Sequence, residues 1–107
     1  MILESARLDV VPGQVSDFLA AFDRARPLIA VQPGFRSLRL LPCLDAGGES
    51  RFLLQVEWDR LEDHTEGFRN SPEYQRWREL LHHFYDPFPL VEHYLLEQPE
   101  DPAPGLG

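Results

Sequence analysis

Histidines and aromatic residues crowd the second half of this 107-residue chain. The segment from His64 to Tyr94 holds all four histidines and seven of the twelve aromatic residues. Leu61, His64 and Phe68 have the spacing of one helix face, which predicts that His64 points toward a sheet. Because imidazole titrates near a pKa of about 6.5, His64 is the leading candidate for a proton acceptor. The alternative is a histidine that is partly solvated or bonded to a backbone carbonyl.

A row of large side chains follows at helical spacing: Tyr74, Trp77, Leu81 and Phe84. These residues could line a flat aromatic pocket, in which the Tyr74 hydroxyl or the Trp77 N–H would orient a substrate oxygen. They could equally be the core of a small protein. Trp58 has the same two interpretations, as a lid over the core or as a pocket wall.

The other histidines are weaker candidates. His82 and His83 are neighbours, so on a helix they point about 100° apart and only one can face inward. Together with Asp86, Glu92 and His93 they show no recognised ligand spacing, and we predict no metal site. If alternate residues of the last strand place His93 toward the helices, it can meet His64; the opposite registry places His93 on the far side of the sheet. The sequence leaves both registries open.

The lone cysteine and four of the ten arginines carry no clear chemistry. Cys43 has no evident base or oxyanion donor near it in the sequence, so a nucleophilic role is not expected. Surface charge balancing the acidic residues is the simplest interpretation of four arginines, Arg36, Arg39, Arg76 and Arg78.

Six elements in the order βαββαβ would position these residues. Strands are predicted over 2–11, 35–44, 51–59 and 90–97, and helices over 13–31 and 60–84. Glu4 interrupts the otherwise apolar row of Ile2, Ala6, Leu8 and Val10 on the first strand. The second helical region has an internal start signal, Ser71 followed by Pro72, and should consist of two pieces that meet at residues 70–71.

The βαββαβ order is typical of an α+β, ferredoxin-like fold, with a four-stranded antiparallel sheet and both helices on one face. The domain should span residues 1–97, followed by a flexible, proline-rich acidic tail over 98–107. The other sheet face is left bare. If apolar side chains such as Leu53 point there, a second copy should cover them, which predicts a homodimer.

Composition narrows the range of functions. The net charge of −8 and the absence of lysine argue against nucleic-acid binding, Schiff-base chemistry and a Walker-type phosphate loop. No apolar run reaches the roughly 20 residues of a membrane span. The N-terminal segment carries charges, and one cysteine cannot form an internal disulfide, so we expect a cytoplasmic protein.

Three short motifs carry a family resemblance: "PGF" at 33–35, "VEW" at 56–58 and "HTEGFRNSPEY" at 64–74. Residues 1–96 resemble the antibiotic biosynthesis monooxygenase family of dimeric α/β-barrel proteins. The family includes cofactor-free oxygenases of phenols and quinols, haem-degrading enzymes and proteins of unknown activity. Haem-degrading members carry an asparagine, a tryptophan and a haem-ligating histidine at positions that align here with Ala6, Phe68 and Arg78. None of the three matches, so haem degradation is disfavoured.

The resemblance implies a cofactor-independent monooxygenase that acts on a small aromatic phenol or quinol, without metal or flavin. His64 would accept a proton from the substrate, and the resulting carbanion would pass an electron to O₂ in a dry cavity. An isomerase or decarboxylase would use the same base without consuming oxygen. The main alternative is a non-catalytic dimeric module that binds a small ligand or is purely structural. The substrate-binding residues predicted here are Trp58, Phe68, Tyr74, Trp77 and His93.

Overall fold

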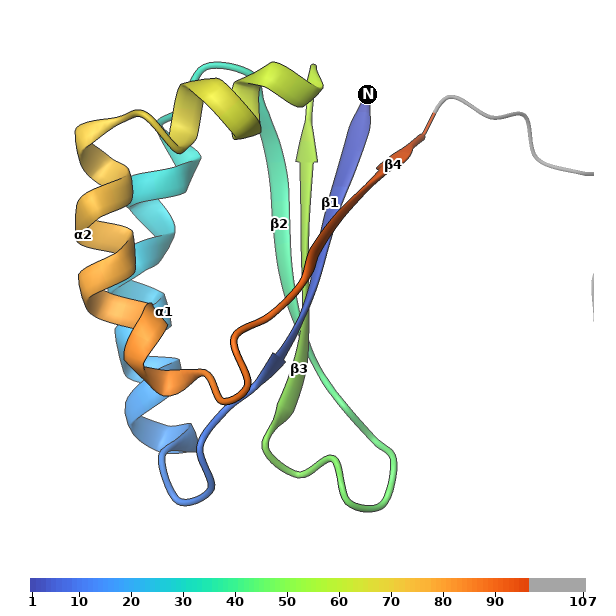
Figure 1. The fold of residues 1–107 in the computed structure, drawn as a ribbon, viewed down its shortest axis with the longest axis vertical. Coiled ribbons are helices and arrows are strands. Elements are labelled where there is room, and N and C mark those ends of the chain that lie inside the picture. The colour runs from blue at the N-terminus through green and yellow to red at the C-terminus, as the bar shows by residue number, and fades with distance from the viewer. Residues whose placement is uncertain (97–107) are drawn as a thin grey trace, which may run out of the picture.

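The computed structural model describes residues 1–96 and has the predicted βαββαβ order (Figure 1). The prediction of a flexible tail over 98–107 lies outside the described residues. Among residues 1–96, no helix is long and apolar enough to cross a membrane. The elements are β1 (Ile2–Asp9), α1 (Val15–Ala30), β2 (Phe35–Pro42), β3 (Arg51–Trp58), the π-helix η1 (Asp63–Phe68), α2 (Pro72–Leu81), the 3₁₀-helix η2 (His82–Phe84) and β4 (Val91–Leu95).

The four strands form one antiparallel sheet in the order β2-β3-β1-β4. Both long helices cover the same sheet face, and the opposite face is bare, as Figure 1 shows. The fold is therefore the α+β, ferredoxin-like arrangement that the sequence predicts. The turn between α1 and β2 also follows the sequence: Gly34, four residues after the end of α1, has a φ of 84° that favours glycine.

Alternation along the strands separates core from surface. Every second residue of β3 is buried, and β1 places Ala6 and Leu8 on the same helix-covered face. Phe18 lies at the centre of this core with no exposed surface and contacts four other rings. Those four rings belong to Phe22, Phe52, Phe84 and Tyr85.

The bare sheet face is mixed in character. Polar pairs cross it, including Ser37 to Glu57 at 2.8 Å and Arg51 to Asp9 at 2.8 Å. Apolar side chains lie among them, from Leu3, Leu41, Leu53 and Tyr94. This face is thus less apolar than the helix-covered one, but it still exposes leucine and tyrosine surface.

The second helical region divides where the sequence predicts. Ser71 is the N-cap of α2, its hydroxyl accepts the Tyr74 N–H at 3.2 Å, and Pro72 occupies the first turn. The piece before it differs from the prediction, because it is a π-helix, closed for example by the Arg69 N–H to the His64 carbonyl.

The wider π-turn changes which side chains share a face. His64 and Phe68, four residues apart, are both buried, at 4% and 2% exposure, whereas Leu61 is 39% exposed. The predicted inward face of Leu61, His64 and Phe68 is therefore wrong for Leu61. A π-turn holds more residues than an α-turn, so a pair spaced by four aligns and a residue three positions earlier does not.

Candidate active site

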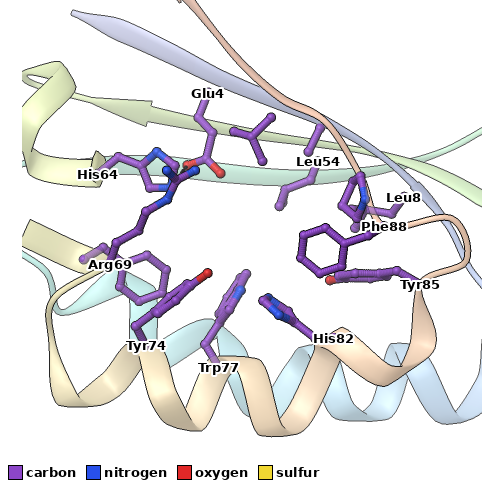
Figure 2. A pocket seen from close by; sticks show the side chains of 14 residues that line it. Glu4, Leu8, Leu54, His64, Arg69, Tyr74, Trp77, His82, Tyr85 and Phe88 are labelled. Carbon is purple, nitrogen blue, oxygen red and sulfur yellow. Dashed lines mark ion pairs between the residues drawn. The ribbon is translucent and has the colours of Figure 1, made fainter. Parts of the chain in front are cut away.

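A cavity lies between the sheet and α2, walled by residues from β1, β3, the π-helix, α2 and the segment that leads into β4 (Figure 2). Its volume is about 90 Å³. That is room for several water molecules or one small ring. It is lined by Glu4, Ala6, Leu8, Leu54, His64, Phe68, Arg69, Tyr74, Trp77, His82, Tyr85, Phe88, Pro89 and Val91.

Three ionisable groups meet at one end of the cavity: Glu4, His64 and Arg69 (Figure 2). Glu4 is buried at 5% exposure, and its Oε1 accepts a hydrogen bond from Trp58 Nε1 at 3.0 Å. The same oxygen lies 3.4 Å from His64 Nε2. Arg69 follows the π-helix and forms no ion pair with any residue in 1–96, so its charge is free to act on the cavity.

Protein groups contact the ring face and both ring nitrogens of His64. Its ring stacks on Trp58, with centroids 5.6 Å apart and an interplanar angle of 20°. Its Nδ1 lies 2.8 Å from His93 Nε2, so one of these two nitrogens donates to the other. The structure thus adopts the registry of β4 that places His93 toward the helices, and His93 pairs across the strands with Glu4.

Burial works against charge at both Glu4 and His64. It raises the pKa of Glu4 from 4.5 to about 7, although the Trp58 hydrogen bond and nearby Arg69 act in the opposite direction. It lowers the pKa of His64 from 6.5 to about 3, with Arg69 and His93 adding to the effect. The 3.4 Å contact has the geometry of an ion pair, but these pKa values make it a contact between a carboxyl group and a neutral imidazole near pH 6.

The aromatic wall of the cavity comes from the π-helix and α2. Tyr74 and Trp77 rise from α2 toward the sheet, and the Tyr74 hydroxyl points into the open space (Figure 2). Phe68 makes edge-to-face contacts with both rings, at 5.2 and 5.5 Å between centroids. The other two members of the predicted row, Leu81 and Phe84, belong to the core.

The opposite end of the cavity is formed by His82, Tyr85 and Phe88. Of the neighbouring histidines, His82 faces inward and His83 is exposed, as helical geometry requires. Burial, and then the charge of Arg78, lower the pKa of His82. Burial also raises the pKa of the Tyr85 hydroxyl above its ordinary value, with Glu4 and Tyr74 adding to the effect.

Not all of the predicted substrate-binding residues reach the cavity. Phe68, Tyr74 and Trp77 line it, but Trp58 is fully buried behind Glu4, and His93 lies behind His64. Cys43 is outside this site, in the loop after β2. Within residues 1–96, no three histidine, cysteine, aspartate or glutamate side chains are grouped as a metal site requires.

Two residues of the polar end were missed by sequence reasoning, Glu4 and Arg69. The signal for Glu4 was present, because a carboxylate stood in the inward-facing row of β1 where every other residue is apolar. A charge in such a row is expensive unless a partner satisfies it, which makes it a candidate functional group. Arg69 gave no such signal, since its position depends on the π-turn.

Comparisons with known proteins agree with this fold. The antibiotic biosynthesis monooxygenase family matches residues 1–80. An uncharacterized protein of Bacillus subtilis, YczJ, is 47% identical over 94 residues, which cover 88% of this chain and 97% of YczJ.

Solved structures give the same result. A Bordetella bronchiseptica protein, provisionally described as an antibiotic biosynthesis monooxygenase, aligns with a TM-score of 0.83 and 31% identity over 91% of this chain and 97% of its own. SnoaB of Streptomyces nogalater, described as a cofactor-independent oxygenase, aligns with a TM-score of 0.71 and 20% identity over 94% of each chain, a likeness of fold alone. The family match and the 47% identical relative show that this chain belongs to the antibiotic biosynthesis monooxygenase family.

Proposed function

We propose that the protein is a cofactor-independent monooxygenase that acts on a small aromatic phenol or quinol. The observation that carries the proposal is the division of the cavity into a polar end, with Glu4, His64 and Arg69, and an aromatic wall, with Tyr74 and Trp77. The aromatic wall suits a flat ring, and the polar end suits its hydroxyl group.

The chemistry needs a proton acceptor and a site that stabilises an anion. The polar end, where Glu4 and His64 lie side by side, takes the hydroxyl proton, and the charge of Arg69 favours the resulting phenolate. The electron-rich anion then reduces O₂. One oxygen atom enters the ring and the other leaves as water, while a quinol is oxidised to a hydroxyquinone. The substrate supplies all the electrons, so no external reductant is required.

Oxygen uptake is the direct test. We expect the purified protein to accelerate O₂ consumption by single-ring quinols above their spontaneous oxidation, including after treatment with a metal chelator. Replacing His64 with alanine or glutamine should lower the rate by about 10²- to 10⁴-fold, the usual effect of losing proton transfer at the site. The matched control is His83→Ala, which changes an exposed histidine outside the cavity and should keep the rate.

Binding of quinols without any enzyme-dependent O₂ uptake would contradict the proposal and would favour a ligand-binding module. Product formation without O₂ uptake would favour an isomerase or decarboxylase.

We also propose that two copies pair through the bare sheet face. Leucine and tyrosine side chains are exposed there, and a twofold axis would bring each polar group of one copy against the same face of the other. Leu53 is central, since it faces Arg7 on β1 and Leu41 on β2.

The dimer is tested by mass in solution. Light scattering should give twice the 12.4 kDa of one chain, and Leu53→Arg should shift the protein to single chains by placing two new cations at the twofold contact. Leu19→Arg adds the same charge on α1, away from the sheet, and should leave the dimer intact. A wild-type protein of single-chain mass at all concentrations would contradict the pairing.

A further inference from the structure

Three titratable side chains form a continuous chain from the cavity outward. Glu4 Oε1 lies 3.4 Å from His64 Nε2, and His64 Nδ1 lies 2.8 Å from His93 Nε2. The register of the sheet fixes the two ends, because Glu4 on β1 and His93 on β4 are direct cross-strand partners on the same face. His64, from the π-helix, bridges them.

The two ends of the series Glu4–His64–His93 have different surroundings. Glu4 is 5% exposed and lines the cavity. His93 is partly exposed and is not among the residues that line the cavity. The three side chains therefore lead from the interior of the site to the protein surface.

At the cavity end, the free base atom belongs to Glu4. Both ring nitrogens of His64 face protein groups, and Glu4 Oε1 is occupied by Trp58 and His64. Glu4 Oε2 has no hydrogen-bond partner in residues 1–96. Since every enclosed side-chain nitrogen or oxygen of the buried residues in 1–96 does have one, Oε2 is not fully enclosed, and Glu4 is a lining residue of the cavity.

We propose that Glu4 exchanges protons with the hydroxyl group of the bound ligand, and that His64 and His93 carry these protons between Glu4 and solvent. The proposal deepens the proposed function and rests on it for the identity of the ligand. Glu4 is then a catalytic residue, whereas His93 is a relay residue that never touches the substrate.

Each transfer conserves protons. The ligand O–H bond breaks and an O–H bond forms at Glu4. As Glu4 Oε2 gains the ligand proton, the proton that the neutral carboxyl group holds on Oε1 passes to His64 Nε2. The Nδ1 proton of His64 then passes to His93 Nε2, and His93 releases its own Nδ1 proton to water. The reverse sequence returns a proton to the cavity, where the departing oxygen atom needs it to leave as water.

The charges around Glu4, His64 and His93 suit proton transfer. The groups that face Glu4 and His64 are Arg69, Tyr74, Tyr85 and His93. With a pKa of about 7, Glu4 can take up and release protons near neutral pH, and with a pKa of about 3, His64 passes protons on without holding an extra one.

A nitrophenol is a suitable probe, because its absorbance shows whether the bound molecule is a phenol or a phenolate. For each phenolate bound near pH 7, we expect the wild-type protein to release fewer protons to the buffer than Glu4→Gln, because Glu4 can keep a proton that glutamine cannot accept. Calorimetry in buffers of different ionisation enthalpy counts these protons. Glu62→Gln changes an exposed carboxylate and should match the wild type. Equal proton release per bound phenolate in wild type and Glu4→Gln would overturn the role of Glu4.

The relay is tested on the same complex by a rapid pH jump. The absorbance should relax at least tenfold more slowly in His93→Gln than in the wild type, and added imidazole should restore the rate, which a purely structural role of His93 would not allow. His83→Gln is the matched control. An unchanged rate in His93→Gln would overturn the relay.

The two proposals can fail separately. Proton transfer from the probe to Glu4 without enzyme-dependent O₂ uptake by quinols would contradict the monooxygenase and leave the relay standing. O₂ uptake that persists in Glu4→Gln would contradict the relay alone. A probe that does not bind would contradict both.

Discussion

Glu4→Gln is expected to stabilise the protein increasingly as the pH rises, by about 2 to 3 kcal/mol between pH 5 and pH 9 relative to the wild type. The pKa of Glu4 is about 7 in the folded protein against 4.5 as its ordinary value, so the folded state binds more protons than the unfolded state between these values. Wild-type stability is therefore lost as the pH rises through this range. Glutamine keeps an oxygen for the Trp58 N–H and never ionises, so it avoids that loss.

The measurement is the free energy of unfolding by denaturant at a fixed protein concentration across this pH range. His64 has the opposite dependence, since its lowered pKa makes stability rise between about pH 3 and 6.5, but it is present in both proteins and cancels in the difference to a first approximation. Glu62→Gln, at an exposed position, should show no increase in the free energy of unfolding relative to the wild type as the pH rises. If the free energy of unfolding changes with pH in the same way in Glu4→Gln and the wild type, the buried carboxyl group does not resist ionisation.

The second large effect is expected at the centre of the core. Phe18→Ala should lower the free energy of unfolding by about 3 to 5 kcal/mol, because Phe18 has no exposed surface and its removal leaves a cavity among four rings. Phe88→Ala, at a 64% exposed ring on the cavity wall, should cost about 1 kcal/mol or less but should weaken ligand binding. Similar losses in the two variants would mean that the cavity wall is structural in the same way as the core.

The aromatic-rich segment from His64 to Tyr94 contributes both to the core and to the cavity wall. Leu81 and Phe84 are core, whereas Phe68, Tyr74 and Trp77 wall the cavity. Phe68 and Trp77 do both, since they are buried and also line the open space. In so small a protein the helix that closes the core must also wall any pocket between it and the sheet.

Much of the fold could be predicted from the sequence because its signals are local. Alternating apolar residues marked the strands, and Ser71 followed by Pro72 marked the start of α2. The registry of β4 could not be predicted, since both faces of that short strand carry polar and apolar residues. It depends instead on long-range pairing with β1, which places His93 opposite Glu4.

The site was predicted less completely, for two physical reasons. His64 was found because imidazole chemistry is recognisable in any setting, but its contacts with Glu4 and His93 join segments far apart in the chain. The π-turn then altered the helical periodicity, which made Leu61 face solvent and brought Arg69 to the cavity. A charged residue within an apolar strand row was the one available signal for Glu4, and its burial shows the value of treating such a break as a functional clue.

The central claim is that the cavity beside Glu4 and His64 binds a phenolic ring with its hydroxyl group at the polar end. The most direct measurement is a crystal structure of the protein with a single-ring quinol bound under anaerobic conditions. We predict the ring against Tyr74 and Trp77, with one hydroxyl oxygen within hydrogen-bond distance of Glu4 Oε2. A quinol bound elsewhere, or bound in the cavity with its hydroxyl groups turned away from Glu4, would contradict the account.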